Sequence, residues 1–265
     1  MNTANVFSRS LSLEEVRELA PAVFADSADD RLSARYTFIP TNRVLAGLMN
    51  VGFVPVEARQ ARTYRASPLH AVHSIRLRRK YEHIALRDSC PEIRLWNSHS
   101  GGAAYQLRMS LWRAVCTNGL IVSRGAFPAV YVPHRGNVVE EVVTGALMMA
   151  ERFDVLAAQV ERMENRHLAK DEQLGFAERA LTIRFPNPAQ CGISPSQLLT
   201  IRRSEDLGDD LYTVLNRTQE NMMRGGLTRR SESGRFTRTR RVTSLREDVR
   251  INSQLWDLAR DVLAA

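Results

Sequence analysis

The sequence has little cysteine and no long apolar run. Its three cysteines, Cys90, Cys116 and Cys191, lie far apart and fit no CxxC or Cys/His spacing of a zinc site. No apolar stretch is long enough to cross a bilayer. The N-terminal residues also lack the apolar core of a secretory signal. These absences predict a cytoplasmic protein with reduced thiols and no membrane partner.

The sequence motifs of common enzyme sites are missing too. The chain contains no GxxxxGK[ST], GxGxxG, GxSxG or HExxH string. Its acidic residues are scattered along predicted helices, as on solvated faces, and form no cluster that would ligate a metal ion. We therefore expect no cofactor, no metal and no catalytic residues.

Positive charge, by contrast, is concentrated in two segments. The net charge is +8. Residues 58–80 (the first basic segment) contain seven positive residues and no acid, and residues 224–246 (the second basic segment) contain eight arginines and the single acid Glu232. Each segment therefore carries +7, and the rest of the chain carries −6. Two basic islands on a slightly acidic body indicate a polyanion partner, although two solvated surfaces without a ligand are the alternative.

Alternating apolar and polar residues predict strands in the first half of the chain. Residues 92–99 and 103–115 are typical of a hairpin around Gly101 and Gly102. In the run HAVHSIRLRRKYEHI, residues Val72, Ser74, Arg76 and Arg78 fall on one face, which predicts a basic strand face. We expect an antiparallel sheet built from hairpins.

Helical spacing and capping residues predict the remaining elements. Ser12 and Glu15 form a capping box, and a single helix of about 25 residues is expected from Asn137 onward. Further helices are predicted over residues 41–51, 171–183, 209–223 and 252–263. The fold class is therefore α+β, with the sheet covered by the long helix and by helices from the second half. Residues 1–223 are expected to form the main domain, and residues 224–265 an Arg-rich arm or edge hairpin with a docking helix.

The basic segments also supply candidate nucleic-acid contacts, because arginine grips phosphate with two donors and stacks on bases. Aromatic residues beside a basic groove are typical of single-strand binding. The candidate residues are Arg59, Arg62, Arg76 and Arg78 for phosphate contacts, Arg229, Arg230, Arg235, Arg238, Arg240 and Arg241 for a clamp or arm, and Tyr64 and Phe236 for stacking.

The turn Asn97-Ser98-His99 is the one cluster with catalytic residue types. A histidine there suits a general base, and Ser98 suits a nucleophile. The same residue types are also ordinary turn formers. A structural turn, a ligand contact and a catalytic site are the three interpretations, and His70, His73 and His134 are the histidines that would have to converge on the turn.

Several strings resemble one family. They are RYTFIPTNRVLAGLMNVGFVPVEARQAR, HAVHSIRLR, PEIRLWNSHSGGAAYQLRMSLWRAVCTNGLIV, NRTQENMMRGG and GRFTRTRRVTSLREDVRINSQLWDLA. Together they resemble the domain of unknown function 932 family, a set of plasmid, prophage and phage proteins, over residues 31–261. The resemblance implies a mobile-element protein and supplies no catalytic residues. The usual acid of the turn is Ser100 here, which weakens the interpretation of the turn as a metal or catalytic site.

These observations lead to a non-enzymatic DNA-binding protein that prefers single strands, neutralises phosphates and releases counterions. The general plan is similar to that of phage single-strand annealing proteins, which is an analogy of fold alone. One alternative is a protein-binding modulator of a host defence or replication system. Another is a metal-dependent nuclease-like enzyme centred on the Asn97-His99 turn. The last helix must bury its apolar side on its own body or on a second copy, which would give a homo-oligomer.

Overall fold

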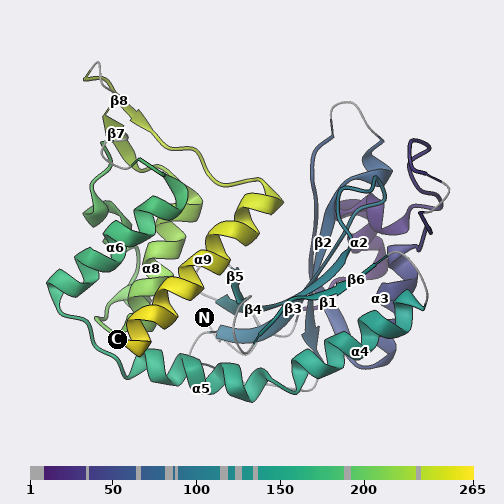
Figure 1. Ribbon diagram of the computed structural model, residues 1–265, viewed down its shortest axis with the longest axis horizontal. Coiled ribbons are helices and arrows are strands. Elements are labelled where there is room, and N and C mark those ends of the chain that lie inside the picture. Colours follow the sequence, from purple (N-terminus) through teal and green to yellow (C-terminus); the bar gives the residue numbers. More distant parts are fainter. Residues whose placement is uncertain are drawn as a thin grey trace. The chain divides into compact units, whose positions relative to one another are not determined.

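The α+β prediction is confirmed by the computed structural model of the chain (Figure 1). The chain divides into two compact units: unit 1 is Met1–Ala114 with Ser123–Asp154, and unit 2 is Val115–Val122 with Val155–Ala265. Residues 224–265, expected as an arm and a helix, belong to unit 2. The structure describes residues 9–33, 36–63, 67–80, 86, 89–113, 119–122, 127–133, 137–187, 192–230 and 234–265.

Unit 1 contains the antiparallel sheet. Its strands are β1 (Phe53–Gln60), β2 (His73–Arg79), β3 (Ser89–Asn97), β4 (Tyr105–Arg113) and β6 (Val130–Val132). The order is β1-β2-β3-β4, and β6 pairs with the first residues of β4. The predicted hairpin around Gly101 and Gly102 is confirmed by the β3–β4 pair. His70 lies in a short 3-10 turn before β2, not in a strand as predicted, because Pro68 starts a turn there.

One face of this sheet is apolar and is covered by helices. The helical elements of unit 1 are α2 (Leu13–Leu19), η1 (Pro21–Phe24), α3 (Thr41–Asn50), η2 (Pro68–His70) and α4 (Val138–Ala150). Leu77, Ile93 and Met109 lie in register on three neighbouring strands and are buried. Helix α4 comes close to this sheet at Gly145, where a Cβ atom would lie 2.9 Å from Val130 Cγ1. The predicted capping box of Ser12 and Glu15 is confirmed at α2.

The prediction of one long helix from Asn137 is wrong. Helix α4 ends at Ala150, and α5 (Phe153–Glu164) begins after a two-residue break. The Arg152 N–H donates to the Met149 carbonyl, only three residues back, at 3.0 Å. This tighter turn ends the regular four-residue hydrogen-bond pattern of α4. The apolar stripe nevertheless continues through the break, because Met149, Phe153 and Leu156 are all buried.

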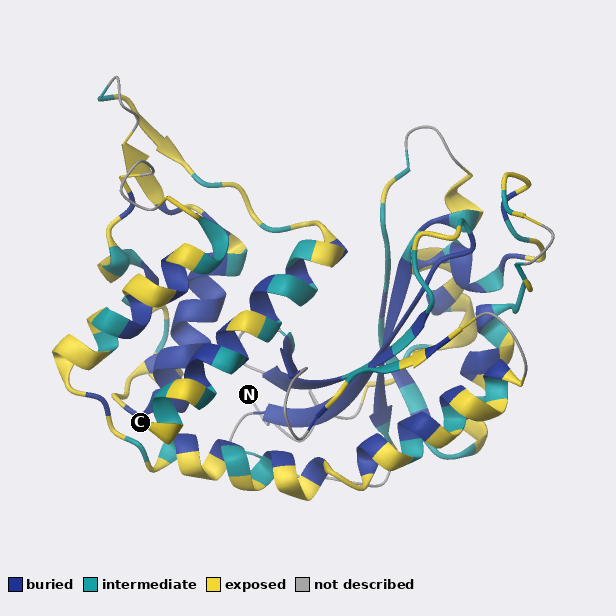
Figure 2. Cartoon of the chain, viewed as in Figure 1, coloured by how far each residue is buried: buried dark blue, intermediate teal, exposed yellow. Residues whose placement is uncertain are grey.

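Unit 2 is mainly helical. Its elements besides α5 are β5 (Gly119–Val122), α6 (Lys170–Arg184), η3 (Pro195–Leu199), η4 (Ser204–Asp206), α8 (Leu211–Arg224), β7 (Thr228–Arg230), β8 (Phe236–Arg238) and α9 (Leu245–Ala264). Helix α9 starts well before the predicted residue 252, because Ser244 caps it. Its Leu255, Trp256, Leu258 and Ala259 are buried, and α9 packs on α6, α8 and β5 of its own unit. Figure 2 shows buried and exposed residues alternating along the helices of this unit. Among the described helices, none is long and apolar enough for a membrane span.

Candidate nucleic-acid interface

The second basic segment forms a two-stranded hairpin. Strands β7 and β8 pair antiparallel, with Arg230 opposite Phe236 and Thr228 opposite Arg238. Threonine and phenylalanine favour strands, and Gly234, at φ 80°, supplies a backbone conformation that other residues rarely adopt. Of the two predicted forms, an arm or an edge hairpin, the structure shows a hairpin that forms its own small sheet.

The base of this hairpin is anchored to the helices of unit 2. The Gln197 side chain behaves like a neighbouring strand, because it accepts from Thr228 N at 2.7 Å and donates to Thr228 O at 2.9 Å. Arg184 donates to the carbonyls of Arg240, at 2.5 Å, and Met222. Gly225, at φ 72°, allows a close approach, since a Cβ there would lie 2.5 Å from Arg240 O. The hairpin therefore leaves the body in a fixed direction, which favours a preorganised surface.

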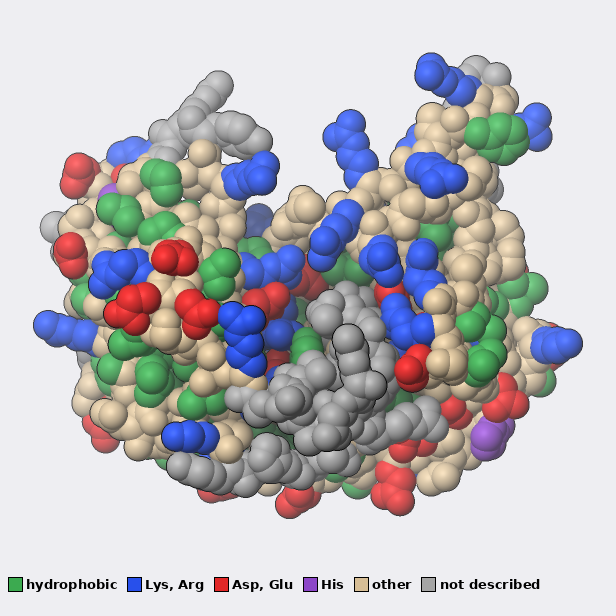
Figure 3. Space-filling view, turned by 180° about the vertical axis from the view of Figure 1, so that it is seen from behind, with side chains coloured by type: hydrophobic (Ala, Val, Ile, Leu, Met, Phe, Trp, Pro, Cys, Tyr) green, Lys and Arg blue, Asp and Glu red, His purple; other side chains and the backbone are tan. Residues whose placement is uncertain are grey.

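The arginine side chains of the hairpin and of the segment that follows it face solvent. The exposed residues are Arg229, Arg230, Arg235, Arg238, Arg240 and Arg241. The blue side chains on the hairpin, at the upper right of Figure 3, are arginines, because this part of the sequence contains no lysine. Among the residues that the structure describes, Arg229, Arg230 and Arg238 form no ion pair with a carboxylate. Their charge is therefore offset by no described carboxylate.

An aromatic ring lies within this basic surface. Phe236 is 68% exposed, and the Arg230 guanidinium carbon lies 5.9 Å from the centre of its ring. A cation at this distance is attracted to the ring face. The ring and the guanidinium are thus held together on the surface of the hairpin, and no apolar neighbours bury the ring.

The first basic segment has a different environment. Arg76 and Arg78 are each only 6% exposed and lie on the sheet face opposite the apolar core. Arg78 contacts the buried Glu92 carboxylate at 2.5 Å, and Arg76 contacts Glu57 at 2.9 Å and Glu92 at 3.4 Å. Both guanidinium groups are therefore paired with carboxylates of the protein itself. We therefore leave Arg76 and Arg78 out of the proposed interface.

The other predicted residues of this segment are less buried. Arg62 is exposed, and Arg59 is partly exposed with Glu57 at 3.8 Å. Tyr64, predicted to stack, lies outside the described residues. The structure thus places Arg229, Arg230, Arg238 and Phe236 on one hairpin of unit 2, whereas Arg76 and Arg78 belong to the sheet of unit 1.

The Asn97-Ser98-His99 turn is completely buried. A threonine that the sequence did not single out, Thr41 at the start of α3, lies at its centre. Thr41 Oγ1 is 2.9 Å from His73 Nε2, 3.0 Å from Asn97 Nδ2, 3.3 Å from His99 Nε2 and 3.2 Å from the Tyr105 hydroxyl. The four partners come from the same end of β2, β3 and β4, so this cluster (the Thr41 cluster) fastens α3 to the sheet.

The protonation of His73 follows from its neighbours. Its Nδ1 lies 2.9 Å from the Ala71 carbonyl, which can only accept, so Nδ1 carries the proton. Burial lowers the pKa of His73 to about 4, although the Ala71 carbonyl opposes this shift. At neutral pH the ring is therefore uncharged, and Nε2 accepts from the Thr41 hydroxyl. A hydroxyl donating to a histidine is the geometry of an activated nucleophile, but Thr41 is fully buried, so a substrate has no access.

We expect the buried His73 to make the protein sensitive to acid. In the unfolded chain His73 titrates near its ordinary pKa of about 6.5. Below that pH the unfolded chain therefore binds a proton that the folded chain does not bind. The free energy of unfolding should fall by about 3 kcal/mol between pH 7 and pH 4 because of this residue. Urea unfolding at both values measures it. In His73→Gln, which keeps an acceptor for Thr41, this component should disappear; an equal fall in both proteins would contradict the assignment.

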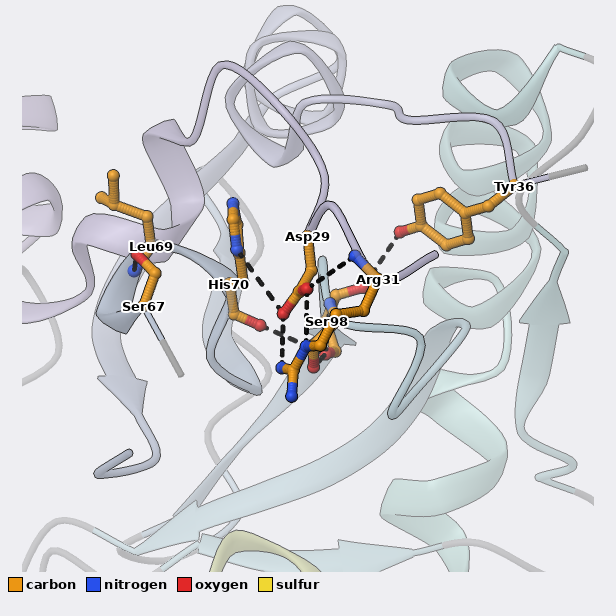
Figure 4. A network of polar contacts seen from close by, with 8 residues as sticks. Asp29, Arg31, Tyr36, Ser67, Leu69, His70 and Ser98 are labelled. Carbon is orange, nitrogen blue, oxygen red and sulfur yellow. Dashed lines mark hydrogen bonds and ion pairs between the residues drawn. The ribbon is translucent and has the colours of Figure 1, made fainter. Parts of the chain in front are cut away.

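A second polar network surrounds the outer side of the turn (Figure 4). The Asp29 carboxylate accepts two hydrogen bonds from the Arg31 side chain, at 2.8 and 2.6 Å, and lies 3.8 Å from His70 Nδ1. The Tyr36 hydroxyl donates to the Ser98 carbonyl at 3.2 Å, and the Ser98 hydroxyl donates to the His70 carbonyl at 3.4 Å. The Arg31 guanidinium lowers the pKa of Asp29 far below its usual range.

These contacts bear on the three interpretations of the turn. A metal-dependent nuclease needs several converging carboxylates, whereas Asp29 here is paired with Arg31. In the part of the chain that the structure describes, no group of three or more His, Cys, Asp or Glu residues could hold a metal ion. His134 lies outside that part. His73 and His99 do converge, but on the Thr41 hydroxyl. The described contacts favour the structural-turn interpretation.

The fold and this surface define an α+β protein with an anchored, exposed, arginine-rich hairpin. The family model described as "Domain of unknown function (DUF932)" matches residues 30–256, and the chain belongs to this family. Two proteins of Escherichia coli K12, named UPF0380 protein YafZ and UPF0380 protein YfjQ, are each 38% identical to it over 256 residues. Each match covers 96% of this chain and 92% of the relative. No solved structure matches the chain.

Proposed function

We propose that this protein binds nucleic acid, with a preference for single-stranded DNA, through its C-terminal hairpin and without catalysis. The observation that carries the proposal is the row of exposed arginines on an anchored hairpin, with no described carboxylate paired to Arg229, Arg230 or Arg238. Phosphate is an anion that arginine binds well, because the planar guanidinium donates two parallel hydrogen bonds to it.

The binding mechanism is neutralisation of the phosphate backbone. Each arginine that contacts a phosphate releases condensed counterions, so affinity falls as salt rises. No base-specific contact is required, and binding is expected to be nearly independent of sequence. The arginines of the hairpin region that follow β8, Arg240 and Arg241, extend the basic surface beyond the hairpin itself.

The setting we propose is the cytoplasm, and the biological context that of a mobile element. The described thiol, Cys90, is buried and free, as suits a reducing compartment.

Self-association stays a prediction. Helix α9 does not supply a surface for it, because the apolar residues expected to meet a second copy are buried in its own unit. A salt-dependent assembly on DNA would need another surface.

A salt series with three polyanions tests the proposal. Affinity for a single-stranded oligonucleotide, a duplex and polyglutamate is measured by fluorescence anisotropy across salt concentrations. We expect the single strand to bind most tightly, with a linear fall of log affinity against log salt. Equal or tighter binding of polyglutamate would favour the alternative partner, an acidic protein surface. Absence of binding to all three would overturn the proposal.

A further inference from the structure

The hairpin has two chemically different faces. Side chains alternate along a strand, and residues directly opposite one another share a face. The pairs Arg230–Phe236 and Thr228–Arg238 therefore lie on one face, which we call the Phe236 face. The pair Arg229–Thr237 lies on the other face. One face combines an aromatic ring with two cations, and the opposite face has a cation and a hydroxyl.

The Phe236 face combines features that suit a flat ligand with more than one negative charge. The Phe236 ring is 68% exposed and has Arg230 across the strand pair, 5.9 Å from its centre. Arg238 follows on the same strand and face, about 6.6 Å farther along the backbone. An exposed ring with one cation across the strand pair and another farther along its own strand offers a stacking surface together with two anion contacts.

The body of unit 2 also holds this face in position. A Cβ atom on Gly192 would lie 2.7 Å from the Arg230 carbonyl oxygen, so the backbone at Gly192 lies directly against β7. Gln197 fixes the first residue of the same strand through both of its backbone groups. The backbone under Arg230 is therefore ordered before any ligand arrives, which lowers the entropy cost of binding.

We propose that the Phe236 face holds one unpaired base, stacked on the Phe236 ring, while Arg230 and Arg238 contact the phosphates on its two sides. This inference rests on the proposed function. It would explain why the protein prefers single-stranded DNA to a duplex. In a duplex the bases are stacked on each other and present only their edges, so Phe236 cannot reach a base face unless a pair opens. The arginines alone would bind both forms of nucleic acid.

Phe236→Ala and its control Thr237→Ala test this assignment. The two residues are adjacent on β8, exposed and on opposite faces, so neither change should affect folding. Three probes are used: an oligothymidylate, an abasic oligonucleotide of the same length and charge, and a duplex. Phe236→Ala should weaken oligothymidylate binding about 5- to 150-fold, the range for one stacked base. It should leave the affinity for the abasic strand and the duplex unchanged, and Thr237→Ala should leave all three unchanged.

Phe236→Trp gives a direct spectroscopic readout. The chain's three tryptophans, Trp96, Trp112 and Trp256, are all buried, so an indole introduced at position 236 is the one open to solvent. Its fluorescence should be quenched by oligothymidylate and not by the abasic strand, because stacking requires a base. Tight binding of oligothymidylate should be retained.

The outcomes separate this inference from the proposed function. Salt-dependent binding of oligothymidylate that is unchanged by Phe236→Ala, or equal wild-type affinity for the abasic strand, would overturn base stacking and leave the proposed function standing. Equal loss for all three probes in Phe236→Ala would also overturn it, since the ring would then support the arginines and not a base. Failure of the wild-type protein to bind any of the probes would remove the proposed function itself.

Discussion

Replacement of Arg229, Arg230 and Arg238 by glutamine is expected to weaken single-strand binding about 50-fold at about 0.15 M salt. For single strands the slope of log affinity against log salt is about −0.7 per neutralised phosphate, so three lost contacts should reduce the slope by about 2. The three side chains are exposed and belong to the hairpin strands, so the fold should not change. Anisotropy titrations at several salt concentrations measure both quantities.

Helices of the same unit supply a control of equal charge. Arg162, Lys170 and Arg179 are exposed on α5 and α6, and their replacement by glutamine removes the same three charges. This control variant should keep the wild-type slope within error, because charges outside the contact surface release no counterions on binding. Equal losses in the two variants would mean that net charge drives binding, and the hairpin would lose its assigned role.

Glu92→Gln is expected to destabilise the fold by about 3 to 5 kcal/mol, the usual cost of breaking a buried ion pair. Glu92 is fully buried and contacts both Arg76 and Arg78. Removing its charge takes away one of the two described carboxylates that lie near these guanidinium groups. The other is Glu57, which lies 2.9 Å from Arg76. Urea unfolding followed by circular dichroism measures the change.

Glu15→Gln is the matched control for this measurement. Glu15 also pairs with an arginine, Arg9 at 2.9 Å, but on the surface, where water screens the two charges and such pairs contribute little to stability. Glutamine also preserves the capping box at Ser12. A cost for Glu92→Gln as small as that for Glu15→Gln would show that Arg76 and Arg78 are solvated, and would return them to the interface as predicted from sequence.

Local features of the fold were predictable because their signals are local. The capping box at Ser12 and the Gly101-Gly102 hairpin were each read from a few adjacent residues, and both are confirmed. The break after α4 was not predicted, since the apolar stripe runs through it without interruption. A sequence pattern predicts which face of a helix is apolar. It does not predict a change in backbone hydrogen bonding within that face, because the order of apolar residues stays the same.

The environment of Arg76 and Arg78 was not predictable for a different reason. Alternation placed both on one strand face, as observed, but it cannot show what lies opposite them. Their partner Glu92 belongs to β3, and Glu57 to β1, so the pairing depends on strand register. A basic strand face was therefore interpreted as open to phosphate, when it is a buried ion-pair network.

The Thr41 cluster and the hairpin anchors also depend on contacts between distant residues. Thr41 is 32 residues from His73 and 64 from Tyr105 along the chain. Gln197 is 31 residues from Thr228, and Arg184 is 56 from Arg240. Nothing in the local sequence marks these residues as partners. The sequence predicted an exposed arm or an edge hairpin here, because the stretch holds many arginines and few apolar residues, and the structure shows a hairpin that forms its own sheet.

Cross-linking of the wild-type protein to an oligothymidylate by ultraviolet light tests the central claim most directly. Cleavage after acidic residues is the suitable digestion, because trypsin would divide the arginine-rich hairpin into very short pieces. The account predicts that the main adduct maps by mass spectrometry to the peptide containing Phe236, between Glu232 and Glu247. Adducts confined to peptides outside residues 224–246 would contradict it.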